Sequence, residues 1–159
     1  TSLNGIEFNE DNISIVLSRN EKSFFNKYYN GISLYIVNDC DHSISVPSVD
    51  GALYIVLEAK DGSGKWRQIE SYPNSKGGNS YGKRDLTPKY FLKFSVPDYR
   101  GGFQTKLRAV LQIYDNKEQH VNVYSNEISG SINPAQFWRG NNEYQLHEFF
   151  EKYISISEQ

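Results

Sequence analysis

The stretch that decides the fold reads KLRAVLQIY over residues 106–114 and VNVYSNEISGSI over residues 121–132. In the first run the odd-numbered residues from 107 to 113 are apolar, whereas Arg108 and Gln112 are polar. Successive side chains of a strand point to opposite faces of a sheet, so this period of two predicts a half-buried strand. The polar connection DNKEQH (115–120) lets the second run fold back beside the first. We therefore predict an antiparallel strand pair here.

The same alternation recurs upstream of this pair. It predicts strands at residues 13–18, 32–37, 53–60 and 90–96, a short strand at 44–46 that Pro47 ends, and a strand at 65–72 after the turn DGSG (61–64). We expect residues 19–31 and 73–89 to be polar connections. Nothing between the strands has a helical period, so the chain is predicted to be all-β. The expected fold is an immunoglobulin-like two-sheet antiparallel sandwich of about seven strands over residues 10–135.

The C-terminus has a different period. Leu146, Phe149, Phe150 and Tyr153 recur at the spacing of one helix face, which predicts a short C-terminal α-helix over about residues 142–154. Two roles are open for this helix: it packs its aromatic stripe on the sandwich, or it presents that stripe to another chain. We expect residues 1–159 to form a single domain, as their number suggests.

Composition excludes several classes of protein. Hydrophobic residues make up 38% and charged residues 23%, which is typical of a globular chain. A formal net charge of −2 gives no electrostatic footprint for nucleic acid. No apolar run is long enough for a transmembrane segment. Cys40 is the single cysteine, so an intramolecular disulfide is impossible.

Motifs that carry chemistry are missing from the sequence. The histidines have no metal-ligand spacing, and there is no nucleophile elbow, phosphate loop or dinucleotide fingerprint. Cys40 and His42 are two residues apart, but a catalytic Cys–His pair is normally assembled from distant segments. We therefore expect no cofactor, no metal and no enzymatic activity. A site assembled only by the fold is the alternative.

Five residues are candidates for ligand binding. Trp66 and Tyr72 belong to the strand predicted at 65–72, and Tyr81, Lys83 and Arg84 belong to the connection predicted at 73–89. Rings beside cations could recognise an anionic or sugar-like ligand through stacking and charge. The alternative is structural: Trp66 covers a sheet edge or lies under a loop, and Tyr81 packs back on the core.

Three segments carry a resemblance to a known family: VPDYRGGFQTKLRAVL (96–111), VYSNEISGSINPAQF (123–137) and GNSY (78–81). With these segments the chain resembles uncharacterised bacterial proteins that have immunoglobulin-like or fibronectin type III-like sandwiches, many of them exported or lipid-anchored. That family has a Cys before its Gly-Asn-Ser, where this chain has Gly77, so a disulfide role is not carried over. The resemblance implies the fold and an extracytoplasmic location (periplasmic, cell-surface or secreted), and no catalytic residues.

These observations lead to two functional hypotheses. The first is a non-catalytic binding or structural module that recognises a protein or peptide partner, since sheet edges and loops can bind without a chemical motif. The second is an accessory carbohydrate-binding module that uses Trp66, Tyr72 and Tyr81 as stacking surfaces. Exposed coplanar rings would favour the carbohydrate-binding hypothesis. A sheet edge without a paired strand would favour recognition of a protein or peptide.

Overall fold

A computed structural model describes residues 2–3, 6–7, 12–75, 80–141 and 157–158. Its elements are β1 (Ser2–Leu3), β2 (Ile6–Glu7), β3 (Ile13–Phe25), β4 (Tyr29–Asn38), β5 (Ile44–Val49), β6 (Ala52–Leu53), β7 (Ile55–Lys60), β8 (Trp66–Gln68), β9 (Tyr81–Leu86), β10 (Tyr90–Pro97), β11 (Phe103–Tyr114), β12 (His120–Tyr124), β13 (Ile128–Ile132), the 3-10 helix η2 (Pro134–Asn141) and β14 (Ser157–Glu158). The predicted all-β class is thus confirmed. The helix predicted at 142–154 lies outside the described residues.

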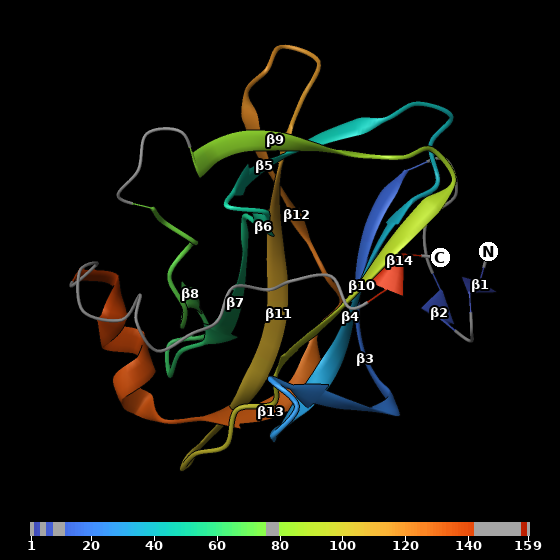
Figure 1. Cartoon of the computed structure of the whole chain (residues 1–159). Helices are drawn as coiled ribbons and strands as arrows, with labels where there is room; N and C mark the ends of the chain where they lie inside the picture. The colour runs from blue at the N-terminus through green and yellow to red at the C-terminus, as the bar shows by residue number, and fades with distance from the viewer. Residues whose placement is uncertain (1, 4–5, 8–11, 76–79, 142–156, 159) are drawn as a thin grey trace.

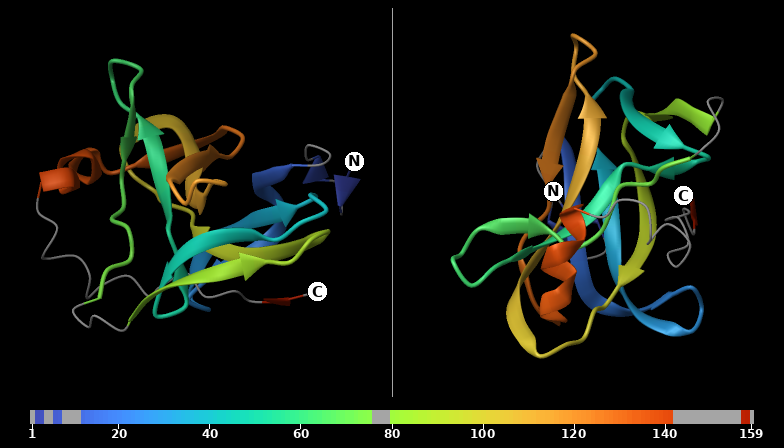
Figure 2. Two further views of the ribbon diagram at one scale, coloured as in Figure 1. Left: turned by 90° about the horizontal axis from the view of Figure 1, so that it is seen from above. Right: turned by 90° about the vertical axis from the view of Figure 1, so that its left-hand side faces the viewer.

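Two larger antiparallel sheets form the body of the molecule (Figure 1). One has the strand order β14-β10-β4-β3, and the other has the order β12-β11-β7-β8, with β13 also paired to β11. Seen from above, the two sheets lie as separate layers (Figure 2, left). Strands β3 and β12 each end their sheet, and these two edge strands lie beside each other on one side of the molecule.

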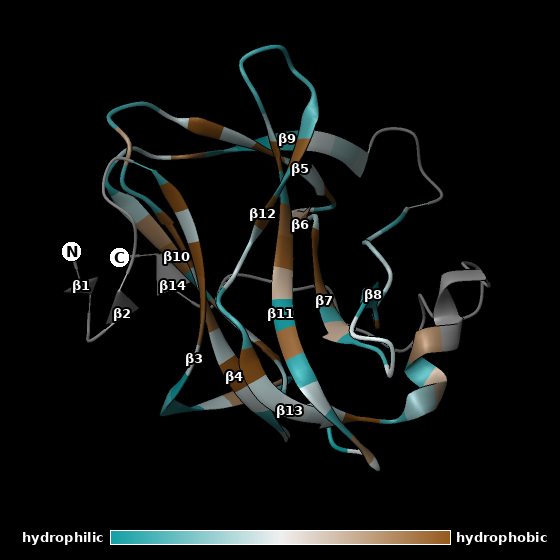
Figure 3. Ribbon diagram, turned by 180° about the vertical axis from the view of Figure 1, so that it is seen from behind, coloured by the Kyte–Doolittle hydropathy of each residue, from teal (hydrophilic) through white to brown (hydrophobic). Residues whose placement is uncertain are grey.

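The core lies between these two layers. Leu17, Leu34 and Phe94 come from the first sheet, and Leu57 and Leu111 from the second; all are buried in one cluster. Burying a side chain of this size contributes about 1.5–3 kcal/mol. Apolar and polar bands alternate along β11, as the sequence predicted (Figure 3). Period-two patterning therefore identified most of the strands that build the core.

A third, smaller sheet has the order β6-β5-β9. Two predictions were wrong here: β5 continues through Pro47 to Val49, and the connection predicted at 73–89 contains the strand β9. Asp50 N–H donates to the Ser80 carbonyl, and alternation from that pair turns the Pro47 nitrogen away from β9. Proline is tolerated there because no ladder bond to β9 is lost, and the Tyr54 carbonyl on its other side accepts the Gln112 N–H instead. Strand β9 is mostly exposed, so it has no apolar alternation to reveal it.

The connection predicted at residues 19–31 was also wrong. Strands β3 and β4 form one long hairpin whose turn places Asn26 and Lys27 at φ 50° and 65°. Positive φ at both central residues matches the twist of paired strands, which favours this kind of turn. The register shifts between Ser18 and Ser23, so the intervening residues of β3 bulge out of the ladder. The polar composition of residues 19–22 belongs to this bulge.

Strand β8 is shorter than the predicted strand at 65–72. After Gln68 the side chain of Ile69 enters the core, and Glu70 Oε2 accepts the backbone N–H of Leu57 at 2.9 Å. The Tyr99 hydroxyl donates to the other oxygen of Glu70 at 2.8 Å. The Glu70 carboxylate thus accepts the backbone N–H of β7 that a neighbouring strand would otherwise bond. The chain therefore leaves this edge of β7 before it reaches Tyr72.

Gly101 offers a sharp test of the packing between β11 and β13. A Cβ atom there would overlap the backbone of Ile132 and Asn133, whereas a Cβ on Gly102 meets nothing within 4 Å. We expect Gly101→Ala to lower the free energy of unfolding by about 1–3 kcal/mol or more, since the backbone must shift. Gly102→Ala is the matched control and should stay within about 0.5 kcal/mol of the wild type. Equal urea midpoints for the two variants would contradict the close approach.

Acid should weaken the bulge of β3. Lys93 and the Tyr35 hydroxyl bond to the Glu21 carboxylate and lower its pKa from 4.5 to about 2. A carboxylate whose pKa is lower in the folded than in the unfolded chain stabilises the fold at any pH above the unfolded-state pKa. This stabilisation is lost as the pH falls from 4.5 toward 2. Urea unfolding should therefore show Glu21→Gln less stable than the wild type at neutral pH, with the gap closing across that window. A gap that stays constant down to pH 2 would contradict the assignment.

Candidate functional site

The last run of the sequence does not form one strand. Strands β12 and β13 both pair with β11 on the same edge, and residues 125–127 separate them. Within this break Ser125 keeps contact with β11: its N–H donates to the Ala109 carbonyl, and its Oγ accepts the Ala109 N–H at 2.8 Å. Both backbone groups of Ala109 in β11 therefore keep a hydrogen-bond partner across the break. Asn126, the next residue, is not part of the β11 ladder and can point away from it.

Asn126 uses this freedom to reach the other sheet. Its Oδ1 accepts the backbone N–H of Leu17 at 2.8 Å, and its Nδ2 donates to the Leu17 carbonyl at 3.0 Å. The side-chain amide thus makes the pair of bonds that a neighbouring strand would make with β3. These two bonds connect the edges of the two sheets at one point.

The remaining part of the β3 edge faces away from β4. Because the backbone of Leu17 points outward to Asn126, alternation also directs the backbone groups of Ile15 and Ile13 outward. The Ile13 N–H is bonded to Asn12 Oδ1 at 2.8 Å. For the Ile15 N–H and C=O, no partner is found among the residues that the structure describes.

Strand β12 presents a similar edge opposite. Two bonds fix its alternation: Asp115 N–H donates to the Gln119 carbonyl, and Ser125 N–H donates to the Ala109 carbonyl. Residues 121 and 123 then bond to β11, so the backbone groups of Asn122 and Tyr124 point away from it. In the described part of the chain no strand is hydrogen-bonded to these groups.

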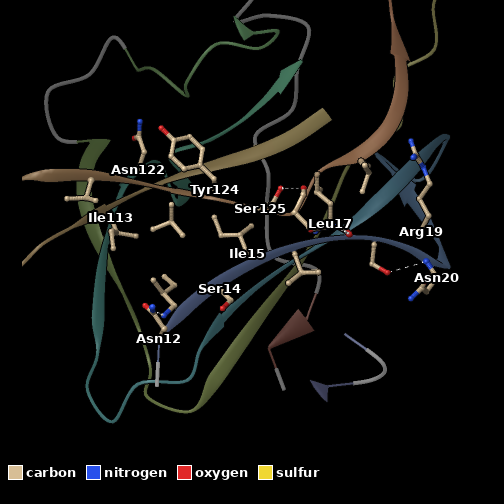
Figure 4. A pocket seen from close by; sticks show the side chains of 17 residues that line it. Asn12, Ser14, Ile15, Leu17, Arg19, Asn20, Ile113, Asn122, Tyr124 and Ser125 are labelled. Atoms are coloured by element: carbon tan, nitrogen blue, oxygen red, sulfur yellow. Dashed lines mark hydrogen bonds between the residues drawn. The ribbon is translucent and has the colours of Figure 1, made fainter. Parts of the chain in front are cut away.

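A groove of about 1070 Å³ lies between the two edges (Figure 4). Ile15 and Leu17 lie on its β3 wall, where the core already buries them (4% and 2% exposed), and Ser14 also lines it. Ile113, Val123 and Ile128 add apolar surface from the opposite sheet. Its rim is polar, with Asn12, Asn20 and Asn122 among its residues. An apolar floor between two polar backbone edges suits an extended chain.

Before the bulge of β3, neither edge carries the usual protection against pairing. Natural edge strands are blunted by charged side chains or proline, yet residues 12–18 (NISIVLS) and 120–124 (HVNVY) contain no Asp, Glu, Lys, Arg or Pro. Both segments are rich in β-branched residues, which favour strands. Asn126 blocks pairing at one end of the groove only. The site is thus chemically ready to accept another strand.

Trp66 and Tyr72, two of the predicted site residues, lie on the outer face of the β7–β11 layer and are half-buried. The Arg108 guanidinium is stacked between two rings, 4.3 Å from the Trp66 centroid and 4.0 Å from that of Tyr124, and it pairs with Glu58 at 2.7 Å. Tyr72 stacks on Tyr54 with centroids 5.7 Å apart. Burial, with a smaller contribution from the charge of Glu58, raises the pKa of Tyr72.

Tyr81, Lys83 and Arg84 lie on β9, away from Trp66. Tyr81 is 48% exposed, and its hydroxyl bonds to Asn74 and Ser75. Lys83 pairs with Glu118 at 2.9 Å and lies 4.5 Å from the centre of the Tyr114 ring. Arg84 is half-buried. The structure therefore divides the five predicted residues between two surfaces, neither of which is the groove.

Other chemistry is sparse in the described residues. Cys40 and His42 both line a pocket of about 460 Å³ beyond one end of the groove, but the Cys40 side chain is buried and His42 Nδ1 faces Asp41 at 3.0 Å. No three side chains of His, Cys, Asp or Glu are grouped to hold a metal ion in the described ranges. Nor does any helix there have the length and apolarity to cross a membrane.

Sequence reasoning missed the groove because its local signals are only an interrupted alternation and a lack of charged residues. Asn126 stands in SNE (125–127), the one polar interruption of an otherwise alternating run, and that interruption marks the break between β12 and β13. The uncharged character of residues 12–18 and 120–124 is also visible in the sequence. What the sequence did not indicate is that these two segments face each other.

Comparisons with known proteins add no identification. No family model matches the chain, and no curated protein matches it at a significant level. The resemblance to exported bacterial sandwich proteins therefore stays a prediction.

The side-chain amide of Asn126 should contribute to the free energy of unfolding. Asn126→Ala leaves the Leu17 N–H and C=O without partners, so we expect a loss of about 1–3 kcal/mol. Asn126→Asp should cost at least as much, because a carboxylate oxygen then faces the Leu17 carbonyl. Asn116→Ala, on the exposed loop before β12, is the control. Urea unfolding measures all three, and an unchanged midpoint for Asn126→Ala would show that the link is dispensable.

Proposed function

We propose that this chain is a non-catalytic binding module that recognises a protein or peptide partner by strand addition. The partner supplies an extended segment, which lies in the groove between β3 and β12. The observation that carries the proposal is the pair of facing edges whose backbone groups at Ile15, Asn122 and Tyr124 lack strand partners in the described residues. Backbone hydrogen bonds provide affinity in this mode, and alternate side chains provide specificity.

The groove restricts the partner segment. The partly buried side chains of Ile113, Val123 and Ile128 line it from the β11 sheet and favour apolar side chains at every second position of the segment. Asn126 occupies the bonding position next to Leu17, so the segment ends there. Between Asn12 and Leu17 there is room for a short segment, on the order of five residues at the usual rise of a strand. The preferred partner is thus an uncharged, alternating peptide end or loop.

We also infer that the sandwich is immunoglobulin-like. The order β3-β4-β10 opposite β12-β11-β7-β8 supports this, since it matches the order A-B-E opposite G-F-C-C′ of that fold. In this scheme β11 and β12 are strands F and G. An extracytoplasmic location completes the proposal, and the resemblance of residues 96–111 and 123–137 supports it.

The carbohydrate hypothesis is the weaker of the two. Tyr81 keeps an exposed ring, which favours it, but Arg108 already lies against the ring of Trp66. Tyr72 packs on Tyr54 rather than beside Trp66 in a flat platform. A sugar would therefore meet one free ring on β9 and not a row of three.

The backbone of Asn122 gives a direct test. Asn122→Pro removes the N–H that faces the groove and leaves every β12–β11 bond intact, whereas Asn122→Thr keeps that N–H. The probe is a peptide of alternating valine and threonine with lysine at both ends. We expect it to shift the amide resonances of Ile15 and Tyr124 in the wild type and Asn122→Thr, and to bind Asn122→Pro at least tenfold more weakly.

The control for folding is the amide spectrum of the core strands, which should be the same in both variants. Shifts confined to β9 or to the ring of Trp66 would place the binding elsewhere. Absence of any shift at Ile15 and Tyr124 with millimolar peptide would refute strand addition.

A further inference from the structure

Three aromatic side chains stand exposed at the turn of the β3–β4 hairpin. Phe24 is 45% exposed, Tyr28 86% and Tyr29 66%, and we call these three rings the aromatic tip. The tip lies at the end of the molecule that carries the loop before β11, at the bottom of Figure 1. Polar residues would serve as well in a solvated turn, so rings at this density call for a binding partner.

The backbone holds the tip in place. Phe25, between the exposed rings, is buried, and Ser23 Oγ lies 2.7 Å from Ser95 Oγ on β10. A Cβ on Gly31 of β4 would stand only 2.9 Å from the Phe25 nitrogen of β3 and would also overlap Ser95 of β10. The three strands are therefore in close contact at this point. The Asp98 N–H also donates to the Asn30 carbonyl at 3.0 Å. The backbone that carries the exposed rings is therefore held against β10 and Asp98.

The charge around the tip is positive although the whole chain carries −2. The Asp98 side chain is 7% exposed, and its carboxylate lies between Arg19 and Arg100, at 2.5 Å and 2.7 Å. Glu21 is neutralised by Lys93 at 2.8 Å.

Lys22 and Lys27 complete this basic surround. Lys22 lies 4.9 Å from the Phe24 ring centre, and neither lysine has a carboxylate partner among the described residues. The surplus cations thus stand beside the exposed rings.

We propose that the aromatic tip binds an anionic lipid surface. Tyrosine is enriched at the membrane interface, where its ring meets the acyl boundary and its hydroxyl stays wet. Lysines beside it gain from the negative surface potential. A convex turn of this kind fits a fluid interface without needing a complementary hollow in a partner protein. The groove reaches Arg19 and Asn20 beside the tip, but none of the three rings and neither lysine lines it, so the module can hold a peptide while it lies on a membrane.

The test is co-sedimentation of the whole chain with vesicles of phosphatidylcholine, with and without phosphatidylglycerol. We expect binding to the anionic vesicles that weakens with salt, and little binding to the neutral ones. Lys22→Gln with Lys27→Gln should weaken it by about fivefold per lysine. Tyr28→Ser with Tyr29→Ser should weaken it several-fold. Thermal unfolding checks that each variant is folded.

Matched controls remove the same groups elsewhere. Lys65→Gln with Lys117→Gln takes two exposed lysines from other turns, and Tyr81→Ser takes an exposed ring from β9. Both, and Asn122→Pro in the groove, should keep wild-type vesicle binding. The proposal fails if anionic vesicles at low salt bind no protein, or if the controls lose as much as the tip variants. Self-association in sedimentation equilibrium that Tyr28→Ser abolishes, without vesicle binding, would make the tip an interface between copies instead.

Discussion

Strand β11 imposes the constraint on which the rest of the structure depends. It bonds to β7 on one edge and to both β12 and β13 on the other, so the last run of the chain has to follow one edge for its whole length. The chain leaves that edge between Ser125 and Ile128, and Ser125 fills the gap with its own backbone and hydroxyl. This detour turns Asn126 toward Leu17, and the two sheets become linked by side-chain amide bonds on their open side.

The same detour explains why a groove exists beside β12. An uninterrupted partner for β11 would have left no residue free to reach β3. With the link made at Asn126, the edges on one side of it are not hydrogen-bonded to each other, and the groove between them is lined by apolar side chains from both sheets. Bare edges of this kind normally invite aggregation, and natural proteins cover or charge them. Their uncharged sequences here are consistent with an edge that is meant to be covered by a partner strand.

Hydrophobic alternation predicted the core strands well because those strands are half-buried. It located β4, β7, β10 and β11 to within a few residues, since each has one face in the core. It failed for β9 and for the outer part of β3, whose residues are mostly exposed and are held by backbone pairing. Pro47 misled because a sequence does not show which way its nitrogen faces. The groove was out of reach for the same reason: facing edges are set by sheet order, which no local pattern encodes.

The aromatic residues around Trp66 pack against other side chains of the protein, although their number suggested a ligand-binding surface. Trp66, Arg108 and Tyr124 stack across three strands, and Glu58 fixes the guanidinium between the rings. Each ring face that meets Arg108 is lost to a ligand, and the stack covers the outer side of the β7–β11 ladder. Cation–π contacts and a shielded ion pair thus use the chemistry that would otherwise suit a sugar. Among the described residues, backbone groups without strand partners are found instead along the edges of β3 and β12, and exposed rings at the turn between β3 and β4.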